Sequence, residues 1–108
     1  MITTTNPATG ETIAEYETLD QNGIDRKLET ATRAFRDWRK TPLEERTKVL
    51  SKLGDLYDAN QEELARLAVT EMGKPITQAR AEVGKCASLL HHFAENGPPM
   101  LESRFWDL

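Results

Sequence analysis

The sequence predicts a mainly helical domain, with a short N-terminal β-hairpin followed by about four amphipathic helices. Two observations carry this prediction. Apolar residues recur at spacings of three and four through most of the chain, which is the period of one helical face. Residues 1–16 instead hold two β-prone stretches, 3–6 and 12–16, on either side of a turn. A chain of 108 residues is long enough for a single small core.

The predicted hairpin turns within Asn6-Pro7-Ala8-Thr9-Gly10. Pro7 presets φ for a turn, and Gly10 accepts the positive φ where the turn closes. A hairpin of two strands is marginally stable in water by itself. We therefore expect it to lie against another part of the chain.

Capping residues mark the starts of the first two helices. The first helix is expected to begin near Asp20 or Asn22, and the second with a capping box between Thr41 and Glu44, with Pro42 at the first helical position. Each helix has an apolar stripe that we expect to be buried, with Phe35 and Trp38 as core residues. The stripes are Ile24, Leu28, Ala31, Phe35 and Trp38, then Val49, Leu50, Leu53, Leu56 and Tyr57.

The pentapeptide Glu71-Met72-Gly73-Lys74-Pro75 separates the third and fourth helices. Gly73 can end a helix in the left-handed conformation, and Pro75 can open the next one. We expect Asn60 to cap the third helix and Gly97-Pro98-Pro99 to end the fourth. The apolar stripes are Leu64, Leu67 and Ala68, then Ile76, Ala79, Val83, Cys86, Leu90 and Phe93.

Composition narrows the classes of partner. The net charge of -4 and the pI of about 5.2 argue against a nucleic acid or an anionic membrane surface. No apolar run approaches the roughly 20 residues of a membrane span, and residues 1–5 have no signal-peptide character. A single cysteine favours a reducing compartment. We therefore predict a cytoplasmic protein.

The residues that suggest chemistry have simpler structural explanations. Cys86 lies in the middle of a helix on an apolar stripe, which favours a buried structural thiol over a nucleophile. His91 and His92 point about 100° apart on a helix, so a surface pair with Glu95 is favoured over a metal site. Lys74 follows one glycine, whereas a phosphate loop needs a glycine-rich run. We predict no catalytic, cofactor-binding or metal-binding residue in this chain.

Several motifs, taken in order, resemble the aldehyde dehydrogenase superfamily. They are Asn6-Pro7-Ala8-Thr9-Gly10-Glu11, Ala34-Phe35-Arg36-Asp37-Trp38 with Pro42 and Glu45-Arg46, Glu62-Glu63-Leu64-Ala65, Glu71-Met72-Gly73-Lys74-Pro75 and Ala81-Glu82-Val83. The form Glu-Met-Gly-Lys, with Lys85-Cys86 and Phe93-Ala94-Glu95-Asn96, is most similar to the succinate-semialdehyde dehydrogenase branch. The resemblance covers about Ile2 to Leu101.

The resemblance implies an NAD(P)-dependent oxidation of an aldehyde to a carboxylate, with succinate semialdehyde as the candidate substrate. In such enzymes a cysteine thiolate attacks the carbonyl and a glutamate activates the water that releases the acid. These residues and the Rossmann-like cofactor domain lie beyond the matched region, so Cys86 is not the family nucleophile. Some members hold a monovalent cation near the positions of Thr4, Thr5 and Glu82. The chain alone is expected to be inactive and to bind no cofactor.

We divide the chain into a family segment, residues 1–101, and a non-family tail, residues 102–108, where the match stops. This departure predicts a truncated or frame-disrupted reading of a longer gene. The expected partners are the rest of an aldehyde dehydrogenase or a second copy, through exposed apolar helix faces. The alternative is a standalone helical protein-interaction domain derived from that scaffold.

Overall fold

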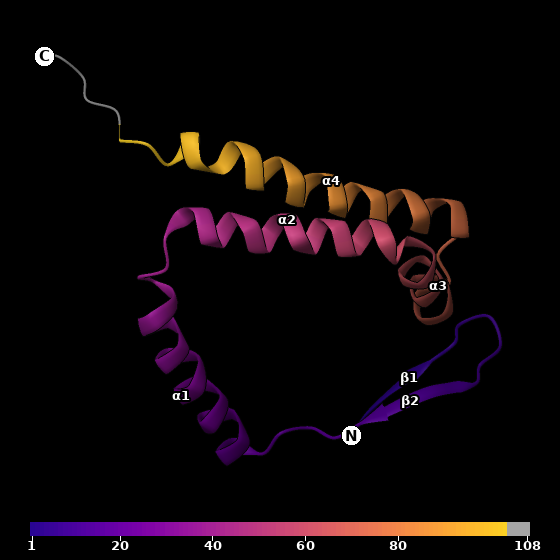
Figure 1. The fold of residues 1–108 in the computed structure, drawn as a ribbon. Coiled ribbons are helices and arrows are strands. Elements are labelled where there is room, and N and C mark those ends of the chain that lie inside the picture. Colours follow the sequence, from indigo (N-terminus) through magenta and orange to yellow (C-terminus); the bar gives the residue numbers. More distant parts are fainter. Residues whose placement is uncertain (104–108) are drawn as a thin grey trace, which may run out of the picture.

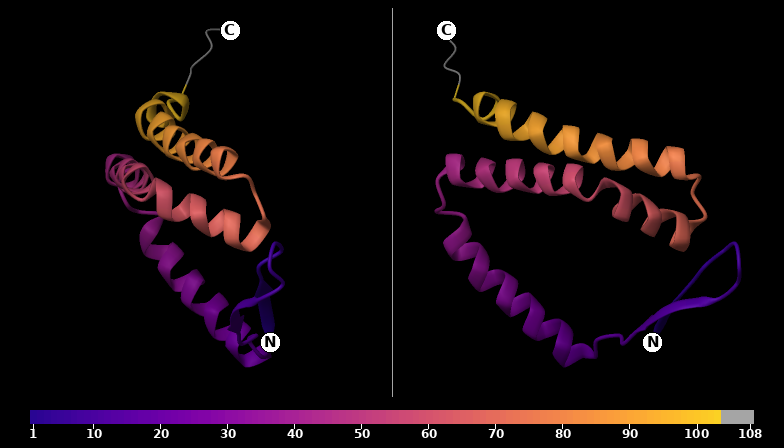
Figure 2. Two further views of the ribbon diagram at one scale, coloured as in Figure 1. Left: turned by 90° about the vertical axis from the view of Figure 1, so that its right-hand side faces the viewer. Right: turned by 45° about the vertical axis from the view of Figure 1, so that its right-hand side comes forward.

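The computed structural model describes residues 1–103, and this part of the chain is mainly helical (Figure 1). The elements are β1 (Ile2–Thr5), β2 (Thr12–Tyr16), α1 (Gln21–Trp38), α2 (Leu43–Ala59), α3 (Gln61–Met72) and α4 (Ile76–Met100). The predicted hairpin followed by four amphipathic helices is confirmed. Helix α4 lies along α2 as a second layer, whereas α1 diverges from the start of α2 (Figure 2).

The hairpin is antiparallel and its turn forms where the sequence predicts it. Ile2 pairs with Tyr16, and an irregularity between Thr4 and Thr5 shifts the register before the turn. The amide oxygen of the Asn6 side chain accepts a bond of 2.9 Å from the Ala8 N–H. Gly10 donates its N–H to the Asn6 carbonyl at 2.8 Å and has φ of 76°. A glycine is favoured there because other residues strain at positive φ.

The hairpin turn lies against the junction between α3 and α4, as Figure 1 shows. Gly73 ends α3 with φ of 67°, in the left-handed conformation expected from the sequence. A Cβ atom on Gly73 would be only 3.1 Å from Cγ of Pro7. Only the turn of the hairpin has this neighbour, since the residues of β1 and β2 are mostly exposed.

The predicted cap of α1 is confirmed, that of α2 is wrong, and Asn60 occupies the N-cap position of α3 without a side-chain cap bond. Asp20 caps α1, with its carboxylate accepting the Gly23 N–H at 2.7 Å. At α2 the N-cap is Pro42, one residue later than expected, so the Thr41 hydroxyl is too early in the chain to cap. Asn60 donates its side-chain amide to the Leu56 carbonyl at 2.7 Å. This bond is at the end of α2, and the side-chain oxygen of Asn60 accepts no cap bond at the start of α3.

The prediction that Gly97-Pro98-Pro99 ends the fourth helix is wrong, because α4 continues to Met100 with both prolines inside it. A proline ring holds φ near -65°, which is a helical value. The cost is confined to the last turn, where the prolines cannot donate to the carbonyls four residues earlier. Leu101 closes the turn by donating its N–H to the carbonyls of Gly97 and Pro98.

The core is small and lies where α3 meets α4. Its buried apolar residues within the described part are Ala65, Ala79, Val83 and Ala87. Partly buried side chains surround it, namely Tyr57, Leu64, Ala68, Val69 and Ile76. Arg80 of α4 also makes a two-bond ion pair with Glu62 of α3, at 2.7 and 3.0 Å. These contacts fix α3, α4 and the adjoining α2 as one unit.

Candidate functional site

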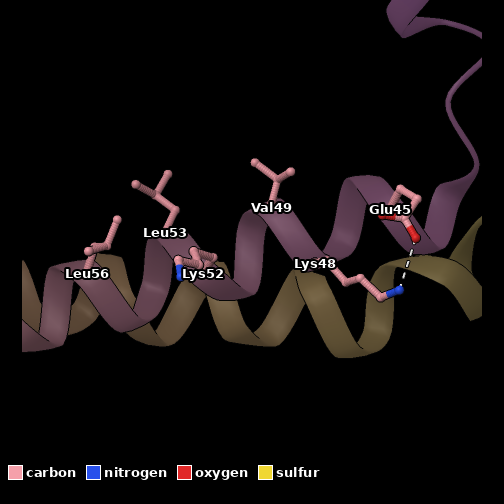
Figure 3. A pocket seen from close by; sticks show the side chains of 6 residues that line it. All are labelled: Glu45, Lys48, Val49, Lys52, Leu53 and Leu56. Carbon is pink, nitrogen blue, oxygen red and sulfur yellow. Dashed lines mark hydrogen bonds and ion pairs between the residues drawn. The ribbon is translucent and has the colours of Figure 1, made fainter.

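The feature with the clearest functional meaning is an uncovered apolar face on α2, called here the outer face of α2. It consists of Val49, Leu53 and Leu56, which project away from α4 (Figure 3). Their exposed fractions are 54%, 40% and 49%. With Glu45, Lys48 and Lys52 they line a shallow hollow of about 430 Å³.

The exposure of this face corrects a prediction, since the sequence pattern places all three residues in a buried face with Leu50 and Tyr57. Only Leu50 and Tyr57 are half-buried. The centre of the packed side is Gly54, which is buried against α4. At 100° per residue, the outer face is centred about 130° from Gly54. The apolar arc of α2 is therefore wider than the part that α4 covers.

Helix α1 presents a second uncovered surface, the stripe of Ile24, Leu28, Phe35 and Trp38. Phe35 is 59% exposed and Trp38 is 48% exposed, so the prediction that they are core residues is wrong for this chain. Within the described part, the extensive helix contacts join α2 to α4 and α3 to α4. Helix α1 stands apart from both, as Figure 1 shows. The amphipathic pattern correctly predicted the helix, but its apolar stripe packs against no other element within the described residues.

Charged side chains border the outer face of α2. The Nζ atom of Lys48 lies 3.0 Å from carboxylate oxygens of both Glu44 and Glu45. Hydrogen bonds from Lys48 to Glu44 and Glu45, aided by their charge, raise the pKa of the Lys48 ammonium. Ion-paired side chains therefore border the hollow, and the rims of protein interfaces are commonly polar in the same way.

Among the residues that suggested chemistry, His91 has the most specific surroundings. Its Nε2 atom lies 3.4 Å from Oδ2 of Asp58 and 3.7 Å from Oδ1 of Asp55. The predicted surface partner was Glu95, one turn along α4, so the carboxylates that His91 approaches are on α2 instead. Sequence spacing could not reveal them, because they depend on how α2 and α4 align.

His92 and Cys86 are placed differently from the expected sites. The His92 ring meets the Phe93 ring edge-on, with 5.2 Å between centroids. Cys86 is half-buried and free. Phe93, predicted on the same buried stripe as Cys86, is 49% exposed, because the stripe facing α2 and α3 runs through Ala79, Val83 and Ala87. Leu67 of α3 is likewise exposed, contrary to its predicted burial.

Two features typical of metal and dinucleotide sites are absent from residues 1–103. Within residues 1–103, no three or more His, Cys, Asp or Glu side chains gather closely enough to hold a metal. Glu82, the carboxylate that the family resemblance offered to a cation, forms an ion pair with Lys74. A dinucleotide fold places its pyrophosphate on a glycine-rich turn between a strand and a helix. The segment 17–20, which leads from β2 to α1, contains no glycine.

Comparison with known proteins identifies the scaffold. The model of the aldehyde dehydrogenase family matches residues 1–105. The chain belongs to this family. It is 44% identical over 98 residues to the succinate semialdehyde dehydrogenase [NAD(P)+] of Escherichia coli, covering 91% of this chain and 21% of that protein. It is 37% identical to the succinate-semialdehyde dehydrogenase [NADP(+)] of Deinococcus radiodurans, covering 94% of this chain and 21% of the relative.

Solved structures give the same family and show which part of the fold is present. A succinic semialdehyde dehydrogenase from Streptococcus pyogenes, solved with NADP+, superposes with a TM-score of 0.91 at 27% identity, over 98% of this chain and 24% of that one. An aldehyde dehydrogenase from Brucella melitensis gives 0.85 at 34% identity, over 91% and 20%. The chain thus has the hairpin and helices of the N-terminal part of the fold, and spans about a fifth of its curated relatives.

Two remaining predictions concern the tail and the membrane. The division at residue 101 stays a prediction, and residues 104–108 of the proposed tail lie outside the described residues. Across the part of the chain that the structure describes, no helix combines the length and apolar character needed to cross a bilayer.

Proposed function

We propose that this chain supplies the N-terminal segment of an NAD(P)-dependent aldehyde dehydrogenase and is inactive without the rest of that enzyme. The proposed net reaction of the whole enzyme is RCHO + NAD(P)+ + H2O giving RCOO-, NAD(P)H and two protons. Succinate semialdehyde is the first substrate to test, because the relatives described above carry that activity in their names. We place the enzyme in the cytoplasm because the single cysteine of this chain has no partner in it for a disulfide, which suits a reducing compartment.

The observation that carries this proposal is the combination of a family scaffold with uncovered apolar faces. The chain matches the family from residue 1 to residue 105 yet spans about a fifth of its relatives. The outer face of α2 and the stripe of α1 lie open in the segment by itself. Large apolar surfaces of this kind mark sites where another protein surface packs.

In this proposal the chain contributes structure and no reacting group. The hairpin, α2, α3 and α4 form a platform that supports the cofactor-binding part of the enzyme. No step of hydride transfer or acyl hydrolysis is assigned to a residue of this chain. Cys86 is free and half-buried on α4.

The test is the formation of NADH or NADPH from succinate semialdehyde. We expect the isolated chain to give none. The same chain, mixed with the Escherichia coli relative lacking its matched 98-residue stretch, should recover aldehyde-dependent reduction that neither part shows alone. Reduction by the isolated chain, or no recovery by the mixture, would refute the proposal.

The second candidate is a standalone interaction domain, which the same exposed faces would also serve. It differs in a measurable consequence, because such a domain would not restore dehydrogenase activity to the deleted relative. The mixing experiment therefore separates the two functions.

A further inference from the structure

The described molecule exposes far more surface than its size requires. Its accessible surface is 8993 Å², whereas a compact protein of 12.2 kDa exposes about 6,000 Å². Its radius of gyration is 19.3 Å, against about 13 Å for a compact chain of this length. The excess of about 3,000 Å² is too large for a single side chain and reflects the open arrangement of the helices.

Seven of the 18 exposed large apolar residues in the described part lie on two helices joined by a short connection. Helix α1 carries the stripe of Ile24, Leu28, Phe35 and Trp38, and α2 carries the outer face. The connection between them, residues 39–42, is bonded to its own neighbours: Lys40 and Thr41 donate their N–H groups to the Asp37 and Trp38 carbonyls, and Nε of Arg46 donates to the Thr41 carbonyl, each at 3.0 Å. Among the described residues, no extensive contact joins α1 to another helix. The angle between α1 and α2 therefore has little support inside the described chain.

The excess area can be compared with the area that different kinds of partner would cover. A standard interface removes about 800 Å² from each partner. One such contact with a second copy of this chain would leave most of the 3,000 Å² excess open. A much larger polypeptide, in contact with several elements, is required to cover it.

The comparison with a complete enzyme identifies which polypeptide. The open arrangement superposes on a full-length relative with a TM-score of 0.91 over 98% of this chain. The angle between α1 and α2 is thus the angle that the segment has when about three quarters of the enzyme lie beside it. Helix α1 has few contacts within this chain, yet the segment has the same shape as in the larger enzyme.

We propose that the stripe of α1 and the outer face of α2 together form the docking surface for the remaining part of an aldehyde dehydrogenase chain. This inference rests on the proposed function and adds to it the surface and its partner. Docking fills the space between the two helices and fixes their angle. The occupant presents a predominantly apolar surface at Leu28 and Leu53 and leaves the rim charges in water.

The experiment measures binding of this chain to the deleted Escherichia coli relative described above. Replacing Trp106 by Phe leaves Trp38 as the only tryptophan, so docking is followed as a blue shift of its fluorescence. Leu28→Asp and Leu53→Asp should each weaken binding at least about tenfold, because each puts a charge into the apolar contact. Thr30→Asp adds the same charge elsewhere on α1 and should bind as the parent chain does.

The outcomes separate this inference from the proposed function. If the parent chain binds and restores activity but both leucine variants do so equally well, the docking surface is wrong and the function stands. If the parent chain neither binds nor restores activity, both are wrong. If the parent chain alone is a dimer and Leu53→Asp is a monomer at the same concentration, the face belongs to a second copy, and the inference fails.

Discussion

The imidazole ring of His91 lies directly over Gly54, where a Cβ atom would meet ring atoms Cε1 and Nε2 at 2.7 Å. Gly54 is the buried centre of the α2 side that packs on α4. The absence of a side chain at this position thus permits the close approach of α2 and α4. It also brings His91 near the carboxylates of Asp55 and Asp58.

The first prediction tests this contact with a double-mutant cycle. In the parent chain Gly54→Ala should lower the free energy of unfolding by about 1–2 kcal/mol, because the added methyl displaces the ring. In the His91→Ala background the same change should raise it by up to about 1 kcal/mol, since alanine favours helix over glycine. Urea unfolding followed by circular dichroism measures both. An equal effect in the two backgrounds would rule out the contact.

The second prediction concerns the contact between Pro7 in the hairpin turn and Gly73 at the end of α3. Gly10 and Gly73 both have positive φ, but only Gly73 has a neighbour, Pro7, within 4 Å of an added Cβ. Gly10→Ala should cost about 1–2 kcal/mol for the backbone alone. Gly73→Ala should cost more, and Pro7→Ala should reduce that excess. Thermal melts of the single and double variants compare the costs, and equal losses for both glycines would contradict the contact.

The third prediction concerns the pH dependence of the Glu62–Arg80 pair. The hydrogen bond from Arg80 lowers the pKa of Glu62 below its ordinary value of 4.5. A carboxyl with a depressed pKa stabilises the folded chain above the unfolded value, and this contribution is lost as pH falls below 4.5. Because the pair is exposed, the effect should be small.

The measurement for this pair is the urea midpoint at neutral pH and near pH 3. Glu62→Gln should reduce the difference between the two midpoints. Glu63→Gln is the matched control, because Glu63 lies one residue away and joins none of the ion pairs of residues 1–103. The idea fails if both variants change the difference equally.

The fourth prediction concerns the only cysteine. Cys86→Ala should leave NADPH formation unchanged in the mixture of this chain with the deleted relative, because the thiol is half-buried and takes no part in the proposed reaction. Complete loss of activity with normal binding would make Cys86 a reacting group. Trp38 fluorescence, in the Trp106→Phe background, reports the binding in the same samples.

Local signals in the sequence predicted much of this fold, because the interactions that start and end a helix involve residues within one helical turn of each other. Asp20 needs only the Gly23 N–H nearby to cap α1, and Gly73 needs only its freedom at positive φ to end α3. Pro98 and Pro99 show the limit of such signals. A proline lacks a donor but keeps a helical φ, so the end of α4 depends on whether the last turn tolerates the missing bonds.

The candidate surface was only partly predictable, since amphipathicity identifies an apolar face but not the polypeptide that covers it. Leu50 and Leu53 belong to the same apolar arc, yet only Leu50 turns toward α4. Nothing in their side chains distinguishes them. The distinction comes from the alignment of α2 on α4 around Gly54, which is a relationship between distant parts of the sequence.

The contact between Pro7 and Gly73 sets an order of events during biosynthesis. The ribosome delivers the hairpin first, but the residue on which it rests emerges only after α3 has been made. Until then the turn has no surface to rest on, and the outer edges of the two-stranded sheet can pair with any neighbouring extended segment. The hairpin is therefore made before α3 but secured after it, and this interval is when its strands are most open to aggregation.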